Sequence, residues 1–141
     1  MARKFRGVEL VKKYREALDE GQSQLIQQTQ GRLSAAAPVD TGRLASSFFV
    51  GKNTPDHTSE APPRKQREPV TITPYPGKIT FGGEWWISNN LPYAQYVALD
   101  PTNKIYGKNG RVGAASWYTI IANNLQRDAN RIFEKEFKKV K

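Results

Sequence analysis

The sequence predicts an α+β domain in which long N- and C-terminal helices pack on a small antiparallel β-sheet, with short connecting helices and one long loop. Three observations lead to this fold class. Apolar residues recur at helical spacing in two long segments, 8–33 and 114–137. Residues 70–89 alternate as strands do, and residues 51–69 are rich in proline and charge. At 141 residues the chain has the size of one domain, so we expect a single domain over 1–141.

The first long helix is expected from Val8 to Leu33, because its apolar residues follow a helical period with polar residues between them. Gly21 and Gly31 interrupt this pattern, which predicts a bend or the close approach of another backbone. The middle of the helix, GQSQLIQQTQG, is rich in glutamine and poor in large apolar groups. This composition favours contact with a second subunit, for which the candidates are Gln24, Gln27 and Gln28.

A tight joint follows at residues 37–50, APVDTGRLASSFFV. Pro38 is expected to end the first helix, and Asp40 to cap a short second helix that runs to about Ser47. Gly42 is unfavourable in the first turn of a helix unless something packs against its backbone. The joint therefore predicts close packing at Gly42, either within the chain or against a neighbouring subunit.

The middle of the chain is expected to form the sheet. FFV begins a first strand at Phe48, and the proline-rich segment 51–69 is expected to be an exposed, mobile loop. Residues 70–89 predict two further strands joined by a Pro-Gly turn at 75–78. The segment NNLPYAQYVALDP predicts a short helix that ends at Pro101.

The charge of the chain is strongly basic, with a net charge of +9. Residues 1–15 carry +5 and residues 131–141 carry +3. Such ends favour an anionic partner such as DNA or an acidic protein surface, with solvated helix ends as the alternative. No apolar run approaches the roughly 18 residues of a membrane helix, so we expect a soluble, unprocessed chain without a membrane partner. The candidate contacts are Arg3, Lys4, Arg6, Lys12, Lys13, Lys138 and Lys139.

Residues that could support catalysis or metal binding are few. The chain has no cysteine, which excludes disulfides and thiolate metal sites. Its one histidine, His57, lies in the proline-rich loop. Glu84 and Asp100 flank the aromatic segment, but no motif sets their spacing. The sequence also lacks the phosphate-binding glycine loop, so we expect no enzyme, no metal and no cofactor.

A basic nucleic-acid-binding module is the alternative function. The basic ends could contact phosphates, and Trp85, Trp86 and Tyr106 could stack on bases. No helix-turn-helix, RNA-recognition or zinc pattern is present. Any binding should therefore be weak, without base readout, and sensitive to salt.

Two motifs together resemble a known family. APVDTGRLASSF at residues 37–48, with ISNNLPYAQYV at residues 87–97, is similar to the neck proteins of tailed bacteriophages, also called head-tail joining, tail-completion or minor tail proteins. In that family a long N-terminal helix ends in such a joint, a small sheet and an Asn-Pro-Tyr-Ala segment follow, and a C-terminal helix closes the chain. Many relatives carry a glutamate and then a glycine shortly after the Tyr-Ala pair, where this chain has Ala98 and Asp100.

The resemblance implies a structural virion protein without catalytic residues. It implies a homo-oligomeric ring, with a hexamer favoured over a dodecamer, in the neck between the capsid portal and the tail. The implied partners are neighbouring neck, portal-adaptor and tail-terminator or tail-tube proteins, with nonspecific contact to packaged DNA. Assembly would take place in the cytoplasm of the bacterial host. Beyond the glutamine-rich helix, the expected interface residues are Asp40, Thr41, Gly42, Arg43, Tyr93 and Tyr96.

Overall fold

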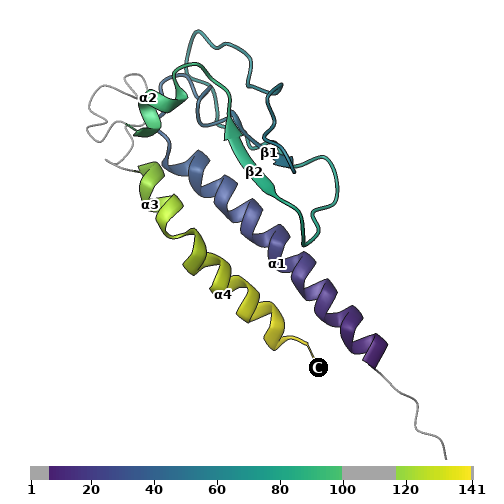
Figure 1. Ribbon diagram of the computed structural model, residues 1–141. Coiled ribbons are helices and arrows are strands. Elements are labelled where there is room, and N and C mark those ends of the chain that lie inside the picture. The colour runs from purple at the N-terminus through teal and green to yellow at the C-terminus, as the bar shows by residue number, and fades with distance from the viewer. Residues whose placement is uncertain (1–6, 100–116, 141) are drawn as a thin grey trace, which may run out of the picture.

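The computed structural model describes residues 7–99 and 117–140 (Figure 1). It confirms the α+β fold class, with a long helix near each end of the chain and a small antiparallel sheet. The elements, in chain order, are α1 (Gly7–Ala36), β1 (Phe48–Lys52), β2 (Trp85–Asn89), α2 (Ala94–Leu99), α3 (Trp117–Asn123) and α4 (Leu125–Lys138).

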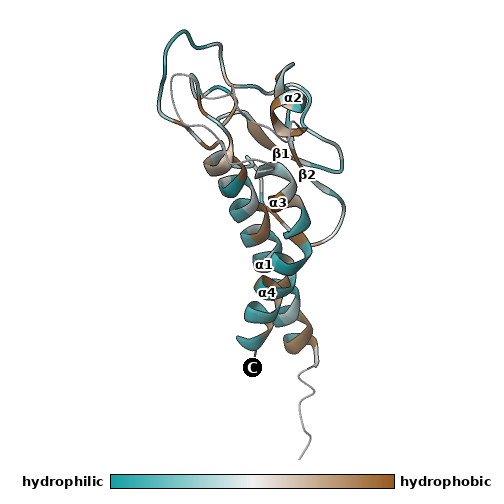
Figure 2. Cartoon of the chain, turned by 90° about the vertical axis from the view of Figure 1, so that its left-hand side faces the viewer, coloured by the Kyte–Doolittle hydropathy of each residue, from teal (hydrophilic) through white to brown (hydrophobic). Residues whose placement is uncertain are grey.

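The helices α1 and α4 lie side by side and run in opposite directions, forming what we call the shaft (Figure 1). With 30 residues, α1 is about 45 Å long. The sheet, the loops around it, α2 and α3 gather at the C-terminal end of α1 and form what we call the head. Figure 2 shows that both shaft helices carry hydrophilic and apolar residues interspersed along their length, as expected for amphipathic helices. No described helix has the length and apolar character needed to cross a membrane.

Gly21 lies where the two shaft helices meet. A Cβ atom at this position would lie 2.6 Å from the ring of Phe133 in α4, which is closer than side chains pack. At Gly31 a Cβ atom would meet nothing within 4 Å. The predicted close approach therefore occurs at Gly21, and it involves an aromatic ring instead of a backbone.

The sheet has two strands, β1 and β2, in an antiparallel register that pairs Phe48 with Asn89 and Lys52 with Trp85. The prediction of two strands joined at 75–78 is wrong, because residues 53–84 contain no strand and β2 pairs with β1. Pro74 and Pro76 lack the N–H groups that a strand ladder needs.

The prediction of a short helix from Asp40 to Ser47 is also wrong. These residues form turns, with one α-helical hydrogen bond from the Ser46 N–H to the Gly42 carbonyl and one 3₁₀-type bond from the Ser47 N–H to the Leu44 carbonyl. The reason is the backbone of Gly42, whose φ of 93° is left-handed and cannot belong to a right-handed helix.

The predicted C-terminal helix is divided into α3 and α4, with a break at Asn124. The proposed start at Ala114 and the helix end at Pro101 lie outside the described residues. The predicted short helix after Asn90 is present as α2.

The core of the head joins every element around it. Phe48 of β1 packs edge-on against Trp117 of α3, with ring centroids 6.2 Å apart. The buried cluster consists of Leu33, Ala37, Val39, Leu44, Ala45, Phe48, Leu91, Val97 and Trp117. The end of α1, the joint, β1 and α2 are thus held by one apolar core.

Candidate assembly site

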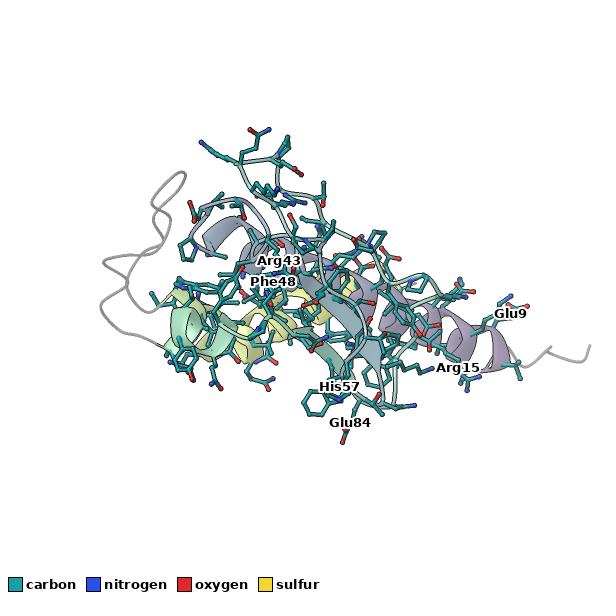
Figure 3. All side chains as sticks on the ribbon, turned by 90° about the horizontal axis from the view of Figure 1, so that it is seen from above. Glu9, Arg15, Arg43, Phe48, His57 and Glu84 are labelled. Atoms are coloured by element: carbon teal, nitrogen blue, oxygen red, sulfur yellow. The ribbon has the colours of Figure 1, made fainter. Side chains whose placement is uncertain are left out.

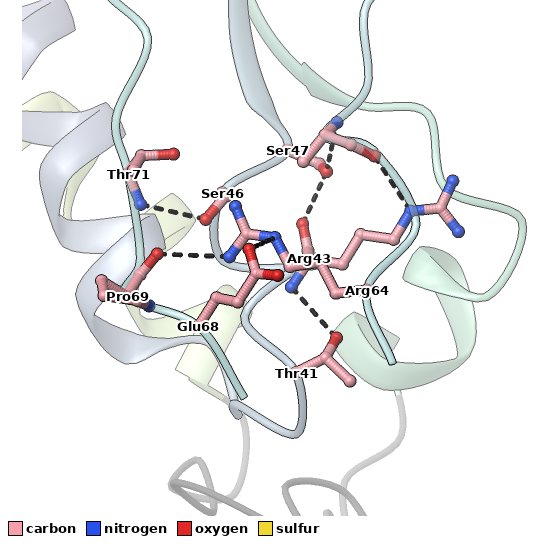
Figure 4. A network of polar contacts seen from close by, with 9 residues as sticks. Thr41, Arg43, Ser46, Ser47, Arg64, Glu68, Pro69 and Thr71 are labelled. Atoms are coloured by element: carbon pink, nitrogen blue, oxygen red, sulfur yellow. Dashed lines mark hydrogen bonds and ion pairs between the residues drawn. The ribbon is translucent and has the colours of Figure 1, made fainter. Parts of the chain in front are cut away.

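Within the joint, the turns at residues 40–47 are attached to the loop that follows β1 by hydrogen bonds to the loop backbone (Figure 4). The Glu68 N–H donates to the Thr41 carbonyl at 3.0 Å. The Ser46 hydroxyl oxygen accepts from the Thr71 N–H at 3.0 Å, and the Ser47 hydroxyl oxygen accepts from the Ala61 N–H at 3.0 Å. The joint therefore fixes the course of a loop that has no secondary structure of its own.

The close packing predicted at Gly42 is found within the chain. A Cβ atom there would lie 2.7 Å from the Glu68 carbonyl oxygen and 2.8 Å from Nη1 of Arg64. This observation favours the intrachain alternative for Gly42. A contact between Gly42 and a second subunit stays a prediction.

Arg43 strengthens the attachment of the loop to the joint, whereas Arg64 makes its polar contacts within the loop. The Arg43 Nε donates to the Ala61 carbonyl at 3.0 Å, and its guanidinium lies 3.4 Å from a Glu60 carboxylate oxygen. The side chain of Arg64 is only 7% exposed, forms an ion pair with Glu68 and donates to the Pro69 carbonyl at 3.2 Å. These contacts anchor the second half of the 51–69 loop, whose mobility stays a prediction.

The two motifs of the resemblance meet in the head. The Asn89 amide donates to the Leu44 carbonyl at 2.9 Å, which links the end of β2 to the joint. The Asn90 amide donates to the carbonyls of Asp56 and Ser59, which ties the same segment to the loop. Segments more than forty residues apart thus form one packed unit.

Tyr93 of the second motif lies near Asp40 and Arg43 of the joint. Burial raises the pKa of Tyr93, Arg43 opposes that shift, and Asp40 and Glu60 add to it. Tyr93 is 39% exposed and Tyr96 on α2 is 64% exposed. Of the predicted interface residues, those of the joint and α2 therefore share one end of the molecule.

The predicted glutamines lie apart from the joint, on the middle of α1. The Gln24 amide donates at 2.8 Å to Glu136 of α4, so it serves the helix pair within the chain. Gln27 and Gln28 are exposed. Sequence reasoning missed the buried Gln30, whose amide donates at 2.8 Å to the carbonyls of both Phe48 and Thr73.

The described basic residues of both chain ends lie together at the far end of the shaft. Lys13 and Lys139 line one hollow of about 370 Å³. Lys138 lies 3.3 Å from Glu134, and Lys139 lies 3.0 Å from Glu136. The exposed Lys12 lies on the same part of α1, whereas Arg3, Lys4 and Arg6 lie outside the described residues.

Glu136 is a buried carboxylate at this basic end, and its pKa is lowered. The hydrogen bond from Lys139 lowers the pKa of Glu136, burial opposes that shift, and the bond from Gln24 adds to it. The carboxylate thus links the two shaft helices where their positive charges gather.

Of the three residues considered for catalysis, the structure describes His57 and Glu84. His57 and Glu84 are exposed at the edge of the molecule (Figure 3), and Asp100 lies outside the described residues. Within 7–99 and 117–140, no three potential metal ligands cluster. The Trp85 indole donates to the carbonyls of Thr80 and Gly82, so this ring is engaged within the chain.

The chain matches no family model, no curated protein and no solved structure. The resemblance to phage neck proteins therefore depends on the two motifs, the order of the elements and the contacts that join the motifs.

Proposed function

We propose that this chain is a structural virion protein that forms a homo-oligomeric ring in the neck of a tailed bacteriophage and joins the capsid portal to the tail. One observation carries this proposal. Segments 37–48 and 87–97, which carry the family resemblance, form one unit through the Asn89–Leu44 hydrogen bond and a shared apolar core. If the two motifs resembled the family only by chance, nothing would require them to pack against each other in the fold.

The division into head and shaft suits a ring subunit. The head presents Asp40, Arg43, Tyr93 and Tyr96 on one end, and exposed aromatics beside charged groups are typical of protein interfaces. A head-to-tail contact that closes on itself generates a ring. A hexamer is favoured over a dodecamer because it matches the sixfold symmetry of phage tails.

Cryo-electron microscopy of the purified virion tests the proposal. We expect density for this chain as a closed ring at the head-tail junction, in contact with portal-adaptor, neck, tail-terminator or tail-tube proteins. Density elsewhere in the particle, or none in purified particles, contradicts the proposal. A reading frame between portal or capsid genes and tail-tube genes is the matching genomic expectation.

The alternative, a basic nucleic-acid-binding module, is favoured by a different observation. Lys13 near the start of α1 and Lys139 after α4 line the same hollow, together with Glu16, Glu20 and Glu136, so the two basic ends of the chain lie side by side. In a neck ring these ends could make nonspecific contact with packaged DNA.

A further inference from the structure

The segment 69–73, PVTIT, has the alternation of a strand but is not part of the sheet. It is held to the molecule at every second residue. The Pro69 carbonyl accepts from Arg64 at 3.2 Å, the Thr71 N–H donates to Ser46 at 3.0 Å, and the Thr73 carbonyl accepts from Gln30 at 2.8 Å. A period of two is the period of an extended chain.

The backbone N–H and C=O groups of the intervening residues, Val70 and Ile72, point to the opposite side of the segment from these three bonds. In an extended chain the N–H and C=O groups of alternate residues point to opposite sides. In the described part of the chain, the backbone groups of Val70 and Ile72 have no hydrogen-bond partner, and the two residues are 36% and 50% exposed. β-Branched residues along an unpaired backbone form the kind of edge that accepts another strand.

A second, different edge is present in β2. This strand pairs with β1 on one side and with no other described strand. None of its residues is buried, and Trp86 is 42% exposed. Neither Val70–Pro74 nor β2 contains a charged residue, although the chain carries +9. Two copies of this basic chain can therefore approach along these edges with little charge repulsion.

We propose that Val70–Thr73 of one copy adds as a short strand to the outer edge of β2 in a second copy. The pairing is heterologous, since two unlike edges of the same chain meet, and this is the kind of contact that can close into a ring. Pro69 and Pro74 confine it to the residues between them. The inference rests on the proposed ring and names the surfaces that form it.

Proline substitution tests the pairing through the outward N–H groups. Ile72→Pro removes the outward N–H group that the added strand needs as a donor. Thr73→Pro is the matched control, because the backbone groups of Thr73 point toward the molecule and its carbonyl, which proline retains, makes the bond to Gln30. In sedimentation of the full chain, we expect self-association to weaken at least about tenfold for Ile72→Pro and to change less than about twofold for Thr73→Pro. Val70→Pro should repeat the loss, and equal melting curves would show that all variants fold.

Mixing the variant with isotope-labelled wild-type chain identifies the partner edge. Ile72→Pro retains its β2 edge, so native mass spectrometry should detect one-to-one pairs of labelled and variant chains. If Val70–Thr73 paired with itself, the variant would bind nothing and the choice of β2 would be overturned. Association of Ile72→Pro equal to that of the wild type, or a wild type that stays monomeric at millimolar concentration, overturns the pairing.

The same measurements separate this inference from the proposed ring. Closed oligomers that are insensitive to Ile72→Pro leave the ring proposal standing and overturn the strand pairing. Dimers or open chains that Ile72→Pro disrupts support the strand pairing and contradict the closed ring.

Discussion

The backbone of Gly42 sets how the joint is held, and a pair of alanine variants separates its two roles. Gly42 and Gly82 have φ angles of 93° and 106°, so alanine is strained at both, by about 1 kcal/mol. Only at Gly42 would the new Cβ also meet a backbone oxygen, that of Glu68 at 2.7 Å. In urea unfolding, Gly42→Ala should lower the free energy of unfolding by about 1–2 kcal/mol more than Gly82→Ala. Equal losses would mean that the contact with Glu68 contributes nothing.

Glu136 should make the stability of the shaft depend on pH. The pKa of Glu136 is lower in the folded chain than its ordinary value of 4.5. Its ion pair and hydrogen bond therefore stabilise the fold above pH 4.5, and this contribution is lost as the pH falls through the lower folded value. Glu136→Gln should lower the free energy of unfolding at pH 7 by up to about 1 kcal/mol, and this difference should shrink as the pH falls below 4.5 and through the lower folded pKa.

The control for Glu136 is Glu134, one turn away from Lys138 on the same helix. Its ion pair joins side chains that are 69% and 75% exposed, so solvent screens it. Glu134→Gln should change the free energy of unfolding by less than about 0.5 kcal/mol over the same pH range. A comparable loss in both variants would show that general charge balance, and not the buried contact, is responsible.

At the scale of the helices, Gly21 and Gly31 have opposite roles in α1. Alanine improves helix propensity by about 1 kcal/mol at either position. At Gly31 nothing lies within 4 Å, so Gly31→Ala should raise the melting temperature. At Gly21 the new Cβ would lie 2.6 Å from the Phe133 ring, which also packs edge-on against Phe81 at 5.9 Å between centroids. Gly21→Ala should therefore lower the melting temperature, and a rise in both variants would contradict this packing of α1 on α4.

The anchored loop should also determine where trypsin cuts within residues 51–84. Lys65 and Arg67 are exposed, whereas the Arg64 side chain is 7% exposed and is bonded to Glu68 and Pro69. Timed digestion with mass spectrometry should detect cleavage after Lys65 or Arg67 before cleavage after Arg64. Early cleavage after Lys52 would instead show that β1 opens readily.

The sequence predicted the long helix α1 and two short elements, β1 from Phe48 and α2 after Asn90. The amphipathic period of α1 extends over many turns, so local errors average out. The alternation at Val70–Thr73 is equally regular, but alternation does not reveal whether a neighbouring strand is available. At Asp40 the capping signal was outweighed by the left-handed backbone of Gly42, which no propensity scale predicts from one sequence.

The candidate site was also predictable only in part, because contiguous motifs can be recognised in a sequence and contacts between distant residues cannot. The motifs at 37–48 and 87–97 could be recognised because each is contiguous. Gln30, which holds the loop to α1, and Ser46 and Ser47, which attach the joint to the loop, act through single bonds to distant backbone groups. Such contacts leave no periodic signal in the sequence, although Gln30 shares a helix face with the buried Ile26 and Leu33.

On the scale of the whole molecule, the two kinds of candidate contact lie at opposite ends. The head carries the joint, the uncharged edges and the exposed aromatics, and the far end of the shaft carries Lys12, Lys13, Lys138 and Lys139. With α1 about 45 Å long, the two ends are separated by several Debye lengths at physiological salt. Contacts at the shaft end should therefore be testable without disturbing the head.

Neutralising pairs of basic residues at each end should locate any DNA binding. Lys12→Gln with Lys13→Gln removes two charges from the shaft end, and Lys65→Gln with Arg67→Gln removes the same number from the head. Fluorescence anisotropy between about 50 and 200 mM salt, on duplexes of unrelated sequence, should give weak binding that falls steeply with salt. The shaft variant should lower the slope of log affinity against log salt by up to about 2, and the head variant should leave it unchanged. Tight, sequence-selective binding at physiological salt would instead favour the nucleic-acid module over the neck protein, because phosphate contacts alone do not discriminate bases.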